Sequence, residues 1–390
     1  MYVILFFARY FMKIYNKSYI LTQFESFLSC SIPYRTIFVD IETTGLSSKK
    51  NNIYCIGLAF FQNDQILIRQ LFAQKQQEEK EILSEFLDFL SKNCNSIFTF
   101  NGKTFDLPFL EKRCALHGLS FSAADYPGKD LLQDFRPLKN LLQLPHLRQK
   151  NLEQFLGIDR EDLYDGGKLI SVYMKYEETQ DPELEHLLRL HNHEDMLGML
   201  RLLPIYQYNI LFQGEFKIQS MHVITEKDHL GTERNSLEIH LSLSDGLPKN
   251  ITGVNEQIRF LFHGKEGIVS LPVYEDTFHY YLPDYKNYYY LTEEHTIIHK
   301  SIAQFVDSQF CQKATPDNCY LPKKGMFLAS NKKSDFFRFQ QDRKDKTYYM
   351  DLSDLLDVDQ KILSADITPA LQEELQLLIA ERLKKFKPML

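Results

Sequence analysis

The order of apolar runs in the first third of the chain constrains the fold more than any other feature. Three runs rich in β-branched and aromatic residues come first, at 36–40, 53–61 and 65–72. The short polar break between the last two predicts a β-hairpin. Apolar residues then recur at helical spacing over 78–93, a fourth strand follows at 96–100, and 107–117 is again helical. This order predicts an α/β sheet with both antiparallel and parallel pairs.

The character of the chain changes after Pro204. Residues 130–203 are mainly helical in pattern, with Asp181-Pro182 as a helix start, whereas the segments from about 215 onward alternate and are broken by Gly, Pro, Asp and Asn. Helices are expected within this second part at 293–310 and 369–385. Because 390 residues exceed the usual size of a single core, we expect two domains, 30–204 and 215–390.

Composition limits the classes of partner. The chain is 44% hydrophobic and 25% charged, as in globular proteins, and its net charge is -7. It therefore has no general attraction for nucleic acid or anionic membranes, and a polyanion would need a local basic patch or bound metal. The first apolar run is interrupted by Arg9 and Lys13 and is too short to span a membrane. With six scattered cysteines and no CxxC pair, we expect a soluble cytoplasmic protein that starts at Met1 or Met12.

The stretch FVDIETTGL places two carboxylates at the end of the first strand. Asp40 and Glu42 flank one isoleucine, so they point to the same side of an extended chain. Two carboxylates held close together repel each other unless a cation lies between them.

Two later motifs add acids that can reach the same edge of the sheet. FNGKTFDLPFL places Asp106 just after a strand, and LHNHEDMLGML places Asp195 on a helix with His191 one turn before it. Each acid alone also fits a turn, a helix cap or a solvated surface. Converged carboxylates, however, suit hard divalent cations such as Mg²⁺ or Mn²⁺.

In this order the three motifs resemble those of DEDD-type 3′–5′ exonucleases of the ribonuclease H-like superfamily. The similarity extends over about residues 35–203 and is greatest to a bacterial branch of ribonuclease H-like domains related to the exonuclease domains of family B polymerases. The segments RPLKNLLQL and NLEQFLGIDREDLYDGGKLISVY also fit that branch. The resemblance implies a mixed sheet flanked by helices, followed here by a β-rich α+β domain.

The resemblance also implies roles for the acids. Asp40, Glu42, Asp106 and Asp195 would hold two divalent cations, Mg²⁺ or Mn²⁺, and His191 would act with Asp195 on the attacking water. One departure affects His191. The tyrosine subclass has Tyr four residues before the last Asp and the histidine subclass has His five before, whereas this chain has His at the tyrosine spacing.

Polar neighbours of the acids are candidates for contacts with substrate. We expect Thr43, Thr44, Asn101 and Lys103 to contact a terminal nucleotide, although each also fits a polar turn or a solvated surface. Asp162 and Asp165 lie either at the rim of the site or in loop caps. A basic stretch is either a path for a phosphate backbone or a solvated helix face; its members are Arg136, Lys139, Arg148 and Lys150.

These features predict a metal-dependent nuclease that removes nucleotides from the 3′ end of RNA or single-stranded DNA, with no membrane partner. The alternative is a non-catalytic nucleic-acid-binding module or an interaction scaffold. In the second domain, 278–291 and 336–349 interleave aromatic and basic residues. They form either a platform for single strands or a strand core with tyrosine edges. We expect this domain to bind substrate or a partner.

Overall fold

The computed structural model describes residues 12–20, 32–162, 166–227, 233–353, 355–356, 361–362 and 367–388. The chain divides into two compact units, Met1–Gln207 and Tyr208–Leu390. Asp165, a candidate at the rim of the site, lies outside the described residues.

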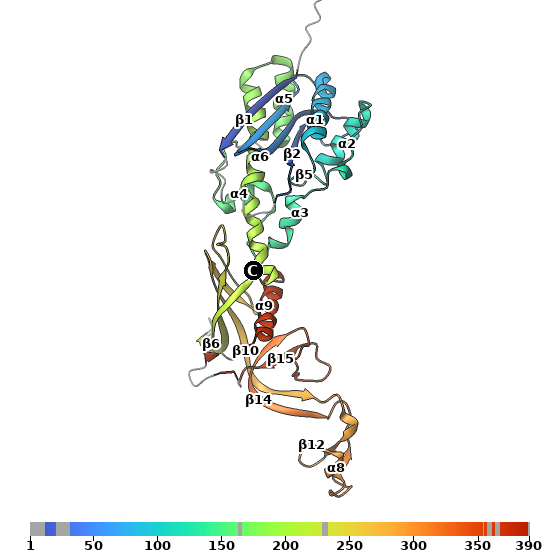
Figure 1. Ribbon diagram of the computed structural model, residues 1–390, viewed down its shortest axis with the longest axis vertical. Coiled ribbons are helices and arrows are strands. Elements are labelled where there is room, and N and C mark those ends of the chain that lie inside the picture. Colours follow the sequence, from blue (N-terminus) through green and yellow to red (C-terminus); the bar gives the residue numbers. More distant parts are fainter. Residues whose placement is uncertain are drawn as a thin grey trace, which may run out of the picture. The chain divides into compact units, whose positions relative to one another are not determined.

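The first unit is built on a five-stranded mixed sheet (Figure 1). Its strands, in the order in which they lie side by side, are β1 (Lys13–Ile20), β4 (Gln65–Phe72), β3 (Ile53–Gln62), β2 (Thr36–Thr43) and β5 (Ser96–Phe98). β2 and β5 are parallel, and the other neighbours are antiparallel. The predicted α/β sheet with both kinds of pairing, including the hairpin of β3 and β4, is therefore confirmed.

The edge strand β1 was not predicted. Its sequence, KIYNKSYI, has no apolar alternation, and all of its residues are exposed or half-buried. Backbone pairing with all eight residues of β4 holds it in place. At the N-terminal end of β1, Lys13 Nζ lies 2.7 Å from Glu185 Oε2, and the Tyr15 hydroxyl donates to the same carboxylate. Such long-range pairing is invisible in local sequence.

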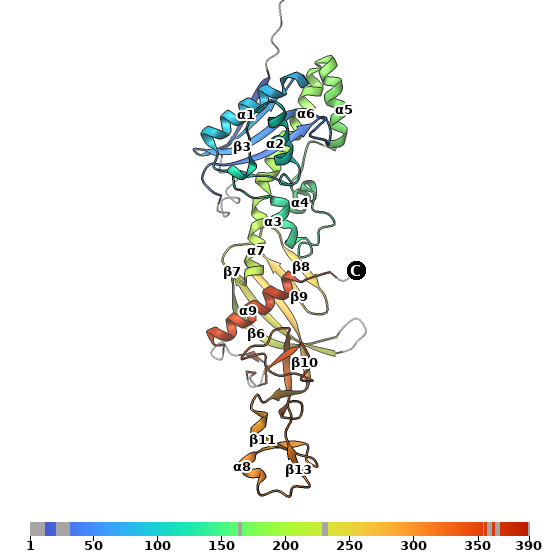
Figure 2. The ribbon, with the colours of Figure 1, turned by 90° about the vertical axis from the view of Figure 1, so that its right-hand side faces the viewer.

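Helices cover both faces of this sheet (Figure 2). α1 (Glu79–Asn93) and α2 (Asp106–Leu116) cover one face, and α5 (Gly166–Thr179) and α6 (Pro182–Arg201) cover the other. Two shorter helices are α3 (Leu131–Phe135) and α4 (Gln149–Leu156), and α4 packs against α6. Val39 and Ile41 of β2 share one core with residues of α1 and α2. On the other face, Tyr54 and Phe72 pack against α5 and α6. Because side chains alternate along a strand, Asp40 and Glu42 point to the face that α6 covers.

The second unit is β-rich, as predicted. Its main sheet has the order β15-β14-β10-β7-β6-β16, and the pair β8–β9 joins it through β10. These strands are β6 (Phe216–Lys227), β7 (Glu233–Leu243), β8 (Ile251–Val254), β9 (Arg259–His263), β10 (Glu266–Tyr281), β14 (Tyr320–Ser330), β15 (Tyr348–Asp351) and β16 (Lys361–Ile362). The short helix α7 (Asn209–Gln213) and the predicted terminal helix, α9 (Pro369–Lys384), pack together, and α9 lies against β6 (Figure 2).

The predicted helix over 293–310 is wrong. This region holds β12 (Thr296–His299) and a single helical turn, α8 (Lys300–Ala303), and β13 (Cys311–Lys313) follows it. The two strands flank β11 (Tyr288–Leu291). His295 has a φ of 52°, so the chain turns sharply there instead of entering a helix. The β-branched Thr296, Ile297 and Ile298 then favour a strand.

The aromatic-rich segments of this unit are partly core. Phe278, Phe327 and Phe339 are buried together, and the Tyr349 ring stacks on Phe278 with centroids 3.9 Å apart. This packing favours the strand-core interpretation for those residues.

Within the described ranges, no helix has the length and apolar character needed to cross a lipid bilayer. The cysteines found there are all free thiols: Cys55, Cys94, Cys114, Cys311 and Cys319.

Candidate active site

Three elements bring the predicted acids together at the end of β2. Asp106 is the first residue of α2, and its Oδ1 accepts the Ile41 N–H at 3.0 Å, between Asp40 and Glu42. From α6, Nδ2 of Asn192 donates to Oδ2 of Asp40 at 2.9 Å. One turn of α6 therefore lies directly over the acid pair of β2.

His191 connects Glu42 with Asp195. Its Nε2 lies 3.6 Å from Oε1 of Glu42 and 3.3 Å from Oδ2 of Asp195. The nearest ligand atoms of these three side chains all lie within 4.8 Å of one another. Asp195 lies within the continuous helix α6, so the interpretation of this acid as part of a helix cap is wrong.

The acids of the candidate site raise the pKa values of one another. Burial raises the pKa of Asp40 well above its ordinary value, and the charges of Asp106, Asp195 and Glu42 raise it further. Burial also raises the pKa of Glu42 to about 8, although His191 opposes the shift. For Asp106, burial raises the pKa to about 7 despite the hydrogen bond from Ile41. Without a cation, the cluster therefore resists full ionisation.

The donor set fits hard divalent cations. All four acids offer carboxylate oxygens, the ligand type that Mg²⁺ and Mn²⁺ take in proteins. The hydrogen bonds from Asn192 and Ile41 each occupy one oxygen, of Asp40 and Asp106 respectively, so each carboxylate keeps a second oxygen for a ligand. A bound cation would also offset the repulsion that raises the pKa values of Asp40, Glu42 and Asp106.

Asp162 orients His191 from the opposite side of the ring. Nδ1 of His191 lies 2.5 Å from Oδ2 of Asp162, and both side chains are buried. Burial lowers the pKa of His191, but the charges of Glu42, Asp195 and Asp162 outweigh it, so the pKa is raised. The Asp162 carboxylate therefore contacts the candidate site through His191.

Arg160 places a cation beside Asp195. Its guanidinium lies 2.6 Å from Oδ1 of Asp195 and 3.1 Å from Oε2 of Glu153, a residue of α4. It also approaches Asp162, at 3.7 Å. Asp195 therefore has one oxygen toward Arg160 and the other toward His191.

The two threonines after Glu42 hold the turn that ends the strand. The buried Thr44 hydroxyl accepts the Asn52 N–H at 2.9 Å, and the Thr44 N–H donates to the Asn52 carbonyl at 2.8 Å. Thr43 Oγ1 donates to the Gly45 carbonyl at 2.9 Å. Both residues thus have a structural role close to the acids.

Asn101 and Lys103 lie in a loop that Asp130 organises. The Asn101 N–H donates to Oδ1 of Asp130, and the Lys103 N–H donates to Oδ2, each at 3.0 Å. Asn101 is exposed and has a φ of 66°. Lys103 lines a cavity of about 460 Å³ together with Thr99 and Leu107.

Sequence reasoning missed several residues that support the site. They are Arg160, Asp130 and Asn192. Asp162 was expected only at the rim of the site or in a loop cap, but it contacts His191. In the sequence these are loop or helix residues with no distinctive spacing. Arg160, Asp162 and Asn192 lie within GIDRED and HNHED, segments that also carry the family resemblance, whereas Asp130 lies in neither.

The match to a known protein family lies in this first unit. A family model described as RNase_H superfamily matches residues 37–206, a range that includes the four acids and His191. The chain is also 30% identical, over 164 residues, to the uncharacterized protein MJ0365 of Methanocaldococcus jannaschii. The aligned region covers 40% of this chain and 87% of that protein. The chain belongs to the RNase H superfamily. Its RNase H domain has a nuclease-type fold, a mixed sheet flanked by helices.

Other relatives match a smaller share of their own length. The uncharacterized protein YprB of Bacillus subtilis is 29% identical over 168 residues, which make up 42% of this chain and 40% of that protein. The solved structures similar to this chain include a family B DNA polymerase of Pyrobaculum calidifontis. The two chains are 13% identical, the match covers 68% of this chain and 35% of the polymerase chain, and the TM-score is 0.35. Exonuclease I of E. coli in complex with a dT13 oligonucleotide is 12% identical to this chain. The match covers 54% of this chain and 55% of the exonuclease chain, with a TM-score of 0.29.

Proposed function

We propose that the RNase H domain is a divalent-metal-dependent nuclease that acts as a 3′–5′ exonuclease on RNA or single-stranded DNA. The observation that carries this proposal is the convergence of Asp40 and Glu42 of β2, Asp106 of α2 and Asp195 of α6 at one end of the sheet. A fold that only needed to be stable would gain nothing from placing four mutually repelling carboxylates together.

The reaction joins a water oxygen to phosphorus and breaks the bond from phosphorus to the 3′ oxygen of the leaving chain. Two divalent cations held by the four carboxylates would stabilise the attacking and leaving oxygens. When Nδ1–H of His191 donates to Asp162, the lone pair at Nε2 faces Glu42 and Asp195. In this proposal, His191 accepts the proton of the attacking water through that lone pair.

The surrounding residues have supporting parts in the proposal. Asn192 positions Asp40 through its 2.9 Å hydrogen bond. Thr43 and Thr44 shape the turn next to the acids, and Asn101 and Lys103 offer polar side chains to the terminal nucleotide. The β-rich unit is proposed to bind substrate or a partner.

The test is hydrolysis of end-labelled RNA and single-stranded DNA by the full chain with Mg²⁺, Mn²⁺ or EDTA. We expect stepwise loss of 3′ nucleotides in either metal and none in EDTA. Asp40→Asn should lower the rate at least about 100-fold, since even loss of an outer-shell partner costs about 10- to 100-fold. The matched control is Asp88→Asn, an exposed acid of α1 paired with Lys92, which should leave the rate unchanged.

One observation favours the second candidate function, a non-catalytic nucleic-acid-binding module. Arg160 already supplies a positive charge to Asp195 at 2.6 Å, which lowers the need for a metal there. In the same assay this module would bind the labelled strands in every condition and cleave none. That outcome would reject the nuclease proposal.

A further inference from the structure

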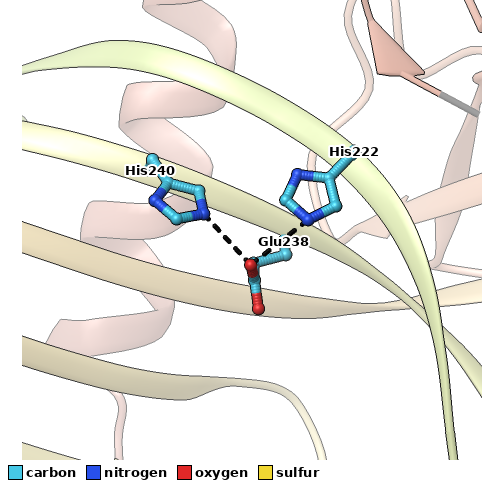
Figure 3. Close-up of side chains that lie close together, drawn as sticks. All are labelled: His222, Glu238 and His240. Atoms are coloured by element: carbon cyan, nitrogen blue, oxygen red, sulfur yellow. Dashed lines mark hydrogen bonds and ion pairs between the residues drawn. The ribbon is translucent and has the colours of Figure 1, made fainter.

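A second group of metal-ligating side chains lies in the β-rich unit. It consists of His222 on β6 and Glu238 and His240 on β7 (Figure 3). The register of the antiparallel pair places His222 directly opposite Glu238. His240 follows Glu238 by two residues, so strand alternation puts its side chain on the same face. We call these three residues the His-Glu-His group.

The His-Glu-His group lies outside the hydrophobic core. Leu237, Ile239 and Leu241 alternate with it along β7 and are buried on the other face of the sheet. The side chains of the group are 31% (His222), 23% (Glu238) and 39% (His240) exposed. An ion from solvent can therefore reach the group without rearrangement of the core.

The geometry is close to that of a metal site. Nε2 of His222 and Nε2 of His240 lie 3.3 Å and 3.0 Å from the same atom, Oε1 of Glu238 (Figure 3). The two rings are nearly parallel, with centroids 5.7 Å apart and an interplanar angle of 23°. Tetrahedral zinc with bonds of about 2.0–2.2 Å requires neighbouring ligand atoms roughly 3.3–3.5 Å apart. The His222–Glu238 distance already has that spacing, the His240–Glu238 distance needs to grow by a few tenths of an ångström, and the ligand atoms of all three residues lie within 4.8 Å of one another.

The donor types point to a particular class of ion. Imidazole nitrogen suits Zn²⁺, Co²⁺, Ni²⁺ and Cu²⁺, whereas Mg²⁺ prefers oxygen alone. Three protein ligands leave a further coordination position open to water or a small anion, as in catalytic zinc sites. His240 also lines a cavity of about 620 Å³ with Ser220, Leu261 and His263, so a bound ion would lie at the edge of this cavity.

We propose that His222, Glu238 and His240 bind one zinc-class divalent ion with a coordination position left open. This site differs from the acidic cluster of the RNase H domain in its ligands and therefore in the metal that it selects. It does not depend on the nuclease proposal.

Cobalt binding to the full chain tests the site directly. The protein should carry Asp40→Asn and Asp195→Asn, so that the acidic cluster of the RNase H domain is weakened as a competitor. We expect one equivalent of Co²⁺ to give visible absorption bands of tetrahedral or five-coordinate cobalt, and Zn²⁺ to displace it. Adding His222→Asn and His240→Asn should lower the affinity for Zn²⁺ at least 100-fold in calorimetry. His186→Asn, an exposed histidine of α6, is the matched control and should change it less than threefold.

Glu238→Gln separates the metal site from a simple hydrogen-bonded trio. Glutamine keeps an acceptor oxygen for the two imidazoles but loses the anionic ligand. In a metal site it should weaken Zn²⁺ binding at least tenfold while thermal stability in EDTA stays within a few degrees. If the protein shows no cobalt bands, or if Zn²⁺ binds equally well with and without His222 and His240, the proposal is wrong.

Discussion

Nδ1 of His191 lies 2.5 Å from Oδ2 of Asp162, and the two residues are separated by 29 positions in the sequence. This contact fixes the ring so that Nε2 faces Glu42 and Asp195. The position of His191 four residues before Asp195 is therefore compatible with a role at the water, although the resemblance alone left that role open. Asp162 acts through His191 and is a positioning residue.

Replacing Asp162 should slow catalysis without removing any of the four proposed metal ligands. We expect Asp162→Asn to lower kcat about 10- to 100-fold, the range for loss of an outer-shell partner. Because the charge of Asp162 helps to raise the pKa of His191, the acidic limb of the pH–rate profile should move to lower pH. A purely structural role would lower activity at all pH values with no shift of that limb. Asp88→Asn serves again as the control.

Divalent cations should stabilise the folded chain more strongly as the pH rises. Glu42 has an ordinary pKa of 4.5 that the fold raises to about 8, and Asp106 rises from 3.8 to about 7. Between the ordinary and the raised values the folded state holds more protons than the unfolded state, so stability without metal falls with increasing pH. The raised pKa of His191 acts in the same direction, because its stabilising charge is lost as the pH rises through the folded value.

Thermal unfolding at several pH values, in EDTA and in Mg²⁺, measures this dependence. The rise in Tm on adding Mg²⁺ should be larger at about pH 8 than at about pH 6. Asp40→Asn should raise Tm in EDTA, since it removes one repelling charge, and should reduce the effect of Mg²⁺. An equal Mg²⁺ effect at both pH values would contradict the prediction.

Removing Arg160 should destabilise the RNase H domain. Its side chain is 9% exposed and it pairs with Glu153, which is 1% exposed, so Arg160→Met leaves a buried carboxylate without its cation. Breaking a buried pair in this way costs about 3–5 kcal/mol. Urea denaturation of Arg160→Met, Glu153→Gln and the double variant measures the coupling. The double variant should be more stable than Arg160→Met alone, and simple additivity would show that the pair is not formed.

Gly57 should be required for the position of Asp40. It lies opposite Asp40 on β3, and a Cβ atom there would come within 2.5 Å of the Asn192 side chain. Gly57→Ala therefore displaces the amide that donates to Asp40. We expect a loss of about 1–3 kcal/mol in stability, typical of overpacking, together with lower nuclease activity.

Gly167→Ala on α5 is the matched control, because a Cβ atom at that position meets nothing within 4 Å. Gly167 is the second residue of α5 and has no positive φ, so alanine fits its backbone. Replacing glycine by alanine at such a position stabilises by about 0.4–1 kcal/mol, so this variant should be as stable as the parent or slightly more stable. If Gly57→Ala and Gly167→Ala have the same stability and the same nuclease activity, the position of the Asn192 side chain does not depend on the absence of a side chain at Gly57.

The sequence by itself determined the strands β2, β3, β4 and β5, the helices α1 and α2, and the acids of the candidate site. Strand alternation placed Asp40 and Glu42 on one side, and helical spacing placed His191 beside Asp195. Both are local periodicities, which a single sequence displays. The alternation after Pro204 likewise identified the β-rich unit, but the segment 293–310 was assigned the wrong element because a sharp turn at His295 is not periodic.

Only the tertiary structure decided which polar residues serve the site. Asp162, Arg160, Asn192 and Asp130 reach their partners across long sequence separations, and so do the strand β1 and the His-Glu-His group. Buried polar groups must find partners when the chain folds. Which partners they find depends on strand register and on which helix covers which face of the sheet, and these are properties of the packed molecule that local sequence does not encode.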